Sequence, residues 1–249
     1  MNSDSIKTFD ILHSTAKEYP LSMLDGEVKE VHPYYYQISE SSQLNFNPDK
    51  SFCRVFILLE GKASFLSNGK NFNYAERAVF IPDPDETFSI KVTDSAKMIE
   101  IRRDLTKIDW EEITTENYHY PFTQSFTNSV QYRESFATLT TVKREIVPQR
   151  VLPRLAMGTV ETKGPDLLGF HDHPMLDQLF FSFSDNHFTM EMDNVKKYLG
   201  GYTLMHIPLG SMHGAHVAAG EIVDYIWMDF TFDSKTGLNY LDSAHKPIK

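Results

Sequence analysis

The chain has little cysteine, no long apolar run and fewer positive than negative charges. Its single cysteine, Cys53, cannot form an internal disulfide, which agrees with a reducing compartment. Apolar runs such as Val55–Leu59 are far shorter than the roughly 18 residues of a membrane helix. The chain has 24 Lys and Arg residues but 34 Asp and Glu residues, which gives a net charge of -10. This excess of negative charge argues against binding to the phosphate backbone of a nucleic acid. We therefore expect no membrane span and no nucleic-acid partner.

The beginning of the chain also lacks the basic and then apolar order of a secretory signal, so we expect a cytoplasmic location. What is present suits a folded protein: 249 residues, 41% hydrophobic and 13% aromatic, form one large or two modest globular domains. Cys53 lies in an apolar run, and we interpret it as a packed core residue rather than a nucleophile.

Strand-forming segments dominate the first 104 residues. Phe52–Glu60 is rich in β-branched and aromatic residues and ends at Gly61, which predicts a strand followed by a turn. Asn68-Gly69 supplies the positive φ angles of a tight hairpin after Ala63–Leu66. More strands are predicted at Ala78–Ile81, Thr87–Val92 and Lys97–Ile101.

The same order of strand, turn, strand and proline-bearing loop recurs in the second half, where Gln178–Phe183 leads through Gly200-Gly201 to Tyr202–Ile207. We predict an all-β protein with two tandem, jelly-roll-like β-barrels in residues 1–104 and 136–249. Residues 105–135 are predicted to be a connector, in which Thr106–Ile113 forms a short helical turn.

A pair of histidines separated by one residue is the most informative feature. In a strand, residues i and i+2 share a face, so His171 and His173 would present two imidazoles to one point. Imidazole binds Zn, Fe, Ni, Mn and Cu. Further ligands would come from Asp177 or Gln178 and from His213. The alternative is that these histidines only form hydrogen bonds in or beside a barrel core.

The two histidine segments resemble the two motifs of the cupin superfamily, Gly-x5-His-x-His-x3–4-Glu and Gly-x5-Pro-x-Gly-x-x-His. The first corresponds to His171-Asp172-His173 with Gln178 downstream, and the second to Pro208–His213. The resemblance implies a two-domain cupin whose second barrel holds a divalent metal (Zn, Ni, Fe or Mn) through four residues: His171, His173, Gln178 and His213.

Gln178 stands where cupins usually carry Glu, but cupins that process unsaturated uronates are similar in using three His and one Gln. Asp177 is the rival ligand, and we favour Gln178 because a gap of four residues is the commoner one. The first half lacks the corresponding groups: Ile81–Thr87 ends without a histidine. It resembles a degenerate cupin barrel that binds no metal.

Residues outside the motifs complete the predicted site. The basic residues Lys143, Arg144, Arg150, Arg154 and Lys163 are either solvated surface charges or a binding site for a substrate carboxylate or phosphate, for which we favour Arg154. Candidate acids and bases are His216, Glu161 and Asp229. Alternation along one strand places Tyr225, Trp227 and Asp229 on one face, either inside the barrel against a sugar ring or outside it.

The sequence thus predicts a metal-dependent cupin enzyme for a small anionic carbohydrate or keto-acid. A divalent metal lowers the cost of an enediolate, which suits isomerisation or ring opening of a sugar acid. The alternatives are a non-catalytic sugar-binding cupin and an iron-dependent cupin dioxygenase. A homodimer is an expectation from the family.

Overall fold

The chain divides into two compact units. The computed structural model describes residues 6–15, 18–116, 118–134, 137–237, 239 and 246–247. The N-terminal unit comprises Thr15–Ser129 with Arg150–Pro153, and the C-terminal unit comprises Met1–Ser14, Val130–Gln149 and Arg154–Lys249. No helix in the described ranges has the length and apolar character needed to cross a membrane.

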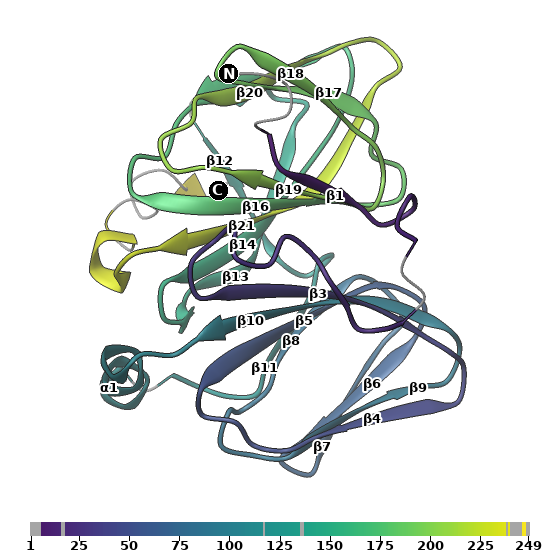
Figure 1. The fold of residues 1–249 in the computed structure, drawn as a ribbon, viewed down its shortest axis with the longest axis vertical. Helices are drawn as coiled ribbons and strands as arrows, with labels where there is room; N and C mark the ends of the chain where they lie inside the picture. Colours follow the sequence, from purple (N-terminus) through teal and green to yellow (C-terminus); the bar gives the residue numbers. More distant parts are fainter. Residues whose placement is uncertain are drawn as a thin grey trace. The chain divides into compact units, whose positions relative to one another are not determined.

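The N-terminal unit consists of two antiparallel sheets (Figure 1). The six-stranded sheet has the order β11-β8-β5-β10-β3-β2, and the four-stranded sheet has the order β4-β9-β6-β7. In chain order the strands are β2 (Leu21–Ser22), β3 (Val31–Ile38), β4 (Ser42–Phe46), β5 (Phe52–Glu60), β6 (Ala63–Ser67), β7 (Lys70–Tyr74), β8 (Ala78–Ile81), β9 (Phe88–Val92), β10 (Ala96–Asp104) and β11 (Phe122–Ser125).

The C-terminal unit repeats this arrangement with an eight-stranded sheet, β1-β19-β16-β21-β14-β13-β12-β22, and a four-stranded sheet, β15-β20-β17-β18. The strands are β1 (Thr8–Asp10), β12 (Val130–Arg133), β13 (Val142–Leu152), β14 (Leu155–Lys163), β15 (Asp166–His171), β16 (Leu176–Ser182), β17 (Phe188–Met192), β18 (Val195–Leu199), β19 (Thr203–Ile207), β20 (His213–Val217), β21 (Ile222–Thr231) and β22 (Lys246–Pro247). The predicted all-β class and the two-fold repeat are confirmed.

Alternating residues of both sheets fill each core, as the strand period of two requires. In the N-terminal unit, Phe56 of β5 and Ile90 of β9 belong to one buried cluster. In the C-terminal unit, Phe180 of β16, Ala215 of β20 and Trp227 of β21 belong to another. Cys53 is 3% exposed and burial raises the pKa of its thiol to about 12, which fits a packed residue.

The divisions of the chain differ from the predicted boundaries at 104 and 136. Thr8–Asp10 pairs with β19 and so belongs to the C-terminal unit, whereas β11 pairs with β8 in the N-terminal unit. The intervening helix α1 (Lys107–Thr115) starts at Thr106, whose side chain forms a capping box with Asp109. The segment predicted as a connector therefore adds β11 to the six-stranded sheet and β12, which pairs with β13, to the eight-stranded sheet.

The β-hairpins of both units contain two-residue turns whose conformation the local sequence determines. Asn68 and Gly69 have φ angles of 52° and 67°, as predicted for the turn between β6 and β7. The equivalent turn of the C-terminal unit is Asp193-Asn194, with φ angles of 49° and 66°. Gly200-Gly201, through which the sequence leads to the strand ending at Ile207, lies between β18 and β19 and is therefore not the counterpart of Asn68-Gly69.

Candidate metal centre

Three imidazoles converge at one end of the C-terminal unit. His171 is the last residue of β15 and pairs with His213, the first residue of β20. One nitrogen of each of His171, His173 and His213 lies within 4.8 Å of the others, and the ring centroids are 4.5 to 5.4 Å apart. His173 lies beyond the end of β15, so the turn after the strand brings it to the others, rather than the shared strand face that the sequence predicted.

Backbone carbonyls fix the orientation of two of these rings. Nδ1–H of His171 donates to the carbonyl of Gly169 at 2.8 Å, and Nδ1–H of His213 donates to that of Ser211 at 2.9 Å. Each bond places the proton on Nδ1 and leaves the lone pair on Nε2. Holding the second ring nitrogen in this way is the usual means of orienting a metal-binding histidine.

Burial keeps both rings neutral. Burial, the neighbouring His213 and, more weakly, Lys143 lower the pKa of His171 to about 3, against the hydrogen bond to Gly169. Burial also lowers the pKa of His213. At neutral pH these imidazoles therefore offer lone pairs rather than protons, as metal binding requires.

Gln178 is held by a buried carboxylate behind it. Its Nε2 donates to Oδ1 of Asp229 at 2.6 Å, across the pairing of β16 with β21. In the described part of the chain, Oε1 of Gln178 and Nε2 of His213 are buried without a hydrogen-bond partner. Burying a polar atom without a partner destabilises a protein, so such atoms indicate that a bound ligand or ion is their partner. A divalent cation with N and O ligands fits this donor set.

Asp177, the rival ligand, points away from this group. Its Oδ1 accepts a hydrogen bond from the backbone N–H of Leu209 at 3.0 Å and lies 3.4 Å from Nε2 of His206. Gln178 shares its strand face with Phe180, whose ring centroid lies 5.7 Å from that of His213. The geometry supports Gln178 as the fourth ligand, which remains a prediction.

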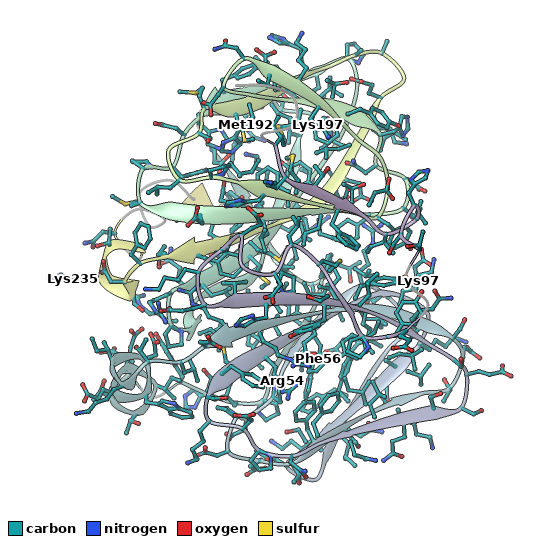
Figure 2. The ribbon with its side chains drawn as sticks, in the orientation of Figure 1. Arg54, Phe56, Lys97, Met192, Lys197 and Lys235 are labelled. Carbon is teal, nitrogen blue, oxygen red and sulfur yellow. The ribbon has the colours of Figure 1, made fainter. Side chains whose placement is uncertain are left out.

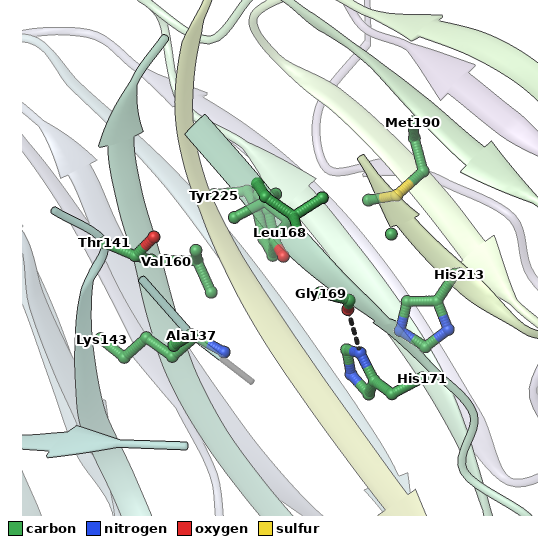
Figure 3. Close-up of a pocket in the computed structure, with 12 residues that line it drawn as sticks. Ala137, Thr141, Lys143, Val160, Leu168, Gly169, His171, Met190, His213 and Tyr225 are labelled. Carbon is green, nitrogen blue, oxygen red and sulfur yellow. Dashed lines mark hydrogen bonds between the residues drawn. The ribbon is translucent and has the colours of Figure 1, made fainter. Parts of the chain in front are cut away.

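A small cavity adjoins the imidazoles on the inner side of the unit (Figure 3). Its volume of about 20 Å³ suits roughly one water molecule. His171 and His213 form one wall, and Lys143 and Tyr225 lie across from them. The other lining residues are Ala137, Thr141, Val160, Leu167, Leu168, Gly169, Met190 and Gly214.

Lys143 places a buried cation in this cavity. The residue is 8% exposed and forms an ion pair with Glu134, which is also 8% exposed. Burial lowers the pKa of Lys143 to about 7, whereas the Glu134 carboxylate favours the ammonium form. A charge-assisted donor beside three imidazoles suits an anionic ligand.

Asp166 fixes the wall that carries Thr141. Its carboxylate accepts hydrogen bonds from the hydroxyls of Thr138, Thr140, Thr141 and Thr162. Burial alone would raise the pKa of Asp166, but these bonds and the Leu167 amide outweigh it and lower the pKa to about 2. The ionised carboxylate therefore holds the 137–141 segment against the start of β15.

Stability should depend on Asp166 in an acid-sensitive way. Because the folded pKa lies below the ordinary 3.8, its contribution is present above about pH 4 and is lost as the pH falls toward 2. We expect D166A to reduce the free energy of unfolding at pH 7 by about 1–2 kcal/mol, discounted for partial exposure. Urea unfolding of wild type and variant at pH 7, 4 and 2.5 measures this difference, which should shrink at the lowest pH. The exposed D185A is the control, and an unchanged difference at all three pH values would contradict the role.

Of the other predicted site residues, some lie on the inner face of the C-terminal unit and some on its outer face. Tyr225 and Trp227 are core residues of the inner face, which decides between the two alternatives left by the sequence. His216 is exposed, on the face of β20 opposite His213, against Phe170. Glu161 faces away from the inner residue Val160 and lies 3.7 Å from Arg144. The structure thus brings neither His216 nor Glu161 to the histidines, because a shift of one or three residues along a strand reverses the face.

Arg154 is not among the residues that line the cavity. It occupies the turn between β13 and β14 with a φ of 58°, and its backbone bonds to Thr231. Lys143, another member of the same basic group, is the one that lies beside the histidines. Sequence reasoning missed Glu134 and Asp166 as well, since no motif marks them. Lys143 itself carried no distinguishing signal, since Arg144, Glu145, Gln149 and Arg150 lie on the same strand.

Comparisons with known proteins reveal the fold. No family model and no curated protein matches the sequence. Among solved structures, the cupin 2 conserved barrel domain protein from Leptotrichia buccalis has a TM-score of 0.61 and 14% identity, over 90% of this chain and 96% of that one. The formate complex of Lactobacillus farciminis oxalate decarboxylase has a TM-score of 0.67 and 10% identity, over 95% and 90%. AerE from Microcystis aeruginosa has a TM-score of 0.63 and 7% identity, over 81% and 88%. The chain therefore has the cupin fold.

Proposed function

We propose that this protein is a metal-dependent enzyme that acts on a small anionic keto-acid or sugar acid by moving a proton next to a carbonyl. The observation that carries the proposal is the group of three imidazoles within 4.8 Å, with Nε2 of His213 and Oε1 of Gln178 buried without hydrogen-bond partners among the described residues. The proposal also includes a cytoplasmic location for the protein and its assembly into a homodimer.

His171, His173, Gln178 and His213 would hold the metal, which when bound polarises a substrate carbonyl. Lys143, in its ammonium form, would donate a charge-assisted hydrogen bond to the substrate carboxylate, and Glu134 holds Lys143 in place. Burial raises the pKa of Tyr225, so its hydroxyl stays protonated and is able to donate a hydrogen bond in the cavity. The apolar residues Val160, Leu168 and Met190 exclude water.

The small cavity also favours a second candidate, cleavage of a carbon–carbon bond in a compact dicarboxylate. A volume of about 20 Å³ accommodates few substrate atoms beyond those at the metal. One structural neighbour is an oxalate decarboxylase in complex with formate. Proton transfer yields an isomer, whereas bond cleavage yields carbon dioxide, so the products distinguish the two reactions.

The test combines metal analysis with a substrate screen. Protein purified without chelators is analysed for Zn, Ni, Fe and Mn, loaded with each metal, and incubated with uronates, small 2-oxo acids and oxalate under NMR. We expect turnover that chelation abolishes. K143M should retain its metal and raise KM about tenfold or more, because a charge-assisted hydrogen bond is lost.

The matched control is K163M, which removes an exposed lysine from β14 of the same unit and should leave KM unchanged. Protein that contains no metal and is indifferent to chelator would refute the proposal. Metal-bound protein that binds sugar acids without converting them would instead identify a binding module. Turnover that consumes dioxygen would indicate a dioxygenase.

A further inference from the structure

The metal-site positions of the C-terminal unit have aromatic counterparts in the N-terminal unit. His171 and His213 pair across β15 and β20, and Phe46 and Phe88 pair in the same way across β4 and β9. The two phenyl rings stack with centroids 4.5 Å apart and an interplanar angle of 7°. Phe56 contacts both rings, as Phe180 contacts His213. A metal ligand set is therefore replaced by an apolar stack.

Two arginines occupy the positions that correspond to Gln178 and Asp229. Gln178 lies two residues before Phe180 and pairs with Asp229, and Arg54 lies two residues before Phe56 and pairs with Arg102. Figure 2 shows Arg54 and Phe56 close together on β5. The end of the barrel that carries neutral and acidic groups in the C-terminal unit is thus cationic in the N-terminal unit.

One buried carboxylate holds both guanidinium groups. Glu100 is 0% exposed and accepts hydrogen bonds from Arg54, from Nε and Nη2 of Arg102, and from the Tyr36 hydroxyl. Aromatic faces fix the guanidinium planes: Arg54 lies 4.7 Å from the Phe52 centroid, and Arg102 lies 4.2 Å from that of Tyr34. The pair is preorganised, with one positive charge more than Glu100 neutralises.

Most of the guanidinium donors are still available. Each guanidinium has five N–H groups, of which Arg54 uses one and Arg102 two on Glu100. None of the nitrogens of Arg54 and Arg102 is among the buried polar atoms without a partner in the described chain, and the two side chains are 14% and 24% exposed. The guanidinium nitrogens that make no hydrogen bond therefore retain some exposure to solvent.

We propose that Arg54 and Arg102 form a second ligand site, independent of the metal centre, that binds a small oxyanion such as a carboxylate or a phosphate. Two planar guanidinium forks held at fixed angles match the oxygens of these groups better than flexible lysines would. Arg54 also lies 5.1 Å from the centroid of Phe46, the ring that stacks on Phe88.

Asp49 is the acidic group that competes with such a ligand. It is exposed, and its carboxylate accepts hydrogen bonds from the Ser51 amide at 2.9 Å and from the Ser51 hydroxyl. Arg54 and Arg102 lie near enough to help lower its pKa, after Ser51. Removing this charge should strengthen binding of an anion.

Calorimetric titration of the full chain with inorganic phosphate and with succinate, against sodium chloride at equal ionic strength, tests the proposal. We expect one site per chain that depends on Arg54 and Arg102. R54M and R102M should each weaken binding about tenfold or more, and D49N should strengthen it a few-fold. K62M, which removes an exposed lysine of the same unit, should leave it unchanged.

If a variant fails to fold, NMR of the arginine Nε–H groups of the wild-type protein tests the same site. The signals of Arg54 and Arg102 should shift when the anion is added. A preference for phosphate or succinate would identify the source of the oxyanion. Absence of binding, or shifts at neither arginine, would overturn the site. Binding that H171A abolishes while R54M retains it would place the anion at the metal centre and equally overturn it.

Discussion

Replacing His213 with alanine is expected to weaken Zn²⁺ binding about a hundredfold or more. Structural zinc sites with four protein ligands bind with about 10–16 kcal/mol, so one ligand in four accounts for roughly 3 kcal/mol, or about a hundredfold in affinity. His213 should carry at least this share, because its Nδ1–H is committed to the Ser211 carbonyl and its Nε2 is buried without a partner among the described residues.

The same strand offers a matched control. H216A removes an imidazole three residues away on the exposed face of β20 and should leave Zn²⁺ affinity unchanged. Competition titration with a zinc-binding dye measures both variants, and circular dichroism checks that they fold. Since His213 is 2% exposed, H213N serves as a second variant that retains more of the side-chain volume. Equal affinity of H213N and wild type would exclude His213 as a ligand.

Replacing Glu100 with glutamine is expected to reduce the free energy of unfolding of the N-terminal unit by about 3–5 kcal/mol. The carboxylate is fully buried and accepts hydrogen bonds from Arg54, Arg102 and Tyr36. Glutamine keeps the shape but leaves two largely buried guanidinium groups without their counterion. Equilibrium urea unfolding followed by tryptophan fluorescence and circular dichroism measures the loss.

Two further variants test whether the destabilisation by E100Q comes from the unpaired charges of Arg54 and Arg102. E60Q breaks the exposed pair of Glu60 with Lys97 on the same two strands and should have little effect. The triple variant R54M/E100Q/R102M removes both arginines as well and should recover part of the stability, because the uncompensated charges are gone. If E100Q is as stable as wild type, the cluster does not hold this end of the unit together.

Local sequence patterns predicted most of the strands that are directly followed by turn-forming residues such as glycine and asparagine. Phe52–Glu60 and Asn68-Gly69 need only neighbouring residues to specify a strand and a hairpin, and both predictions are confirmed. Strands with weaker patterns were missed, among them β3 and β4, where Pro33, Gln43 and Asn45 interrupt the apolar run. Their strand conformation depends on pairing with β10 and β9.

The residues of the candidate site also fall into those that the sequence predicted and those that only the structure identified. Motif spacing was sufficient to select His171, His173 and His213, which the structure brings together. It could not select Lys143 over Arg154, or exclude His216, because those choices depend on which strand faces meet across the unit.

By itself, the sequence determined the β-rich character, the Asn68-Gly69 turn and the two histidine segments, since each is specified by residues a few positions apart. Only the tertiary structure decided that Thr8–Asp10 completes the C-terminal sheet, that Glu134 and Lys143 meet beside the imidazoles, and that Arg54 and Arg102 share Glu100. The physical reason is that strand register, set by long-range pairing, determines which side chains share a face, and a shift of one residue reverses it.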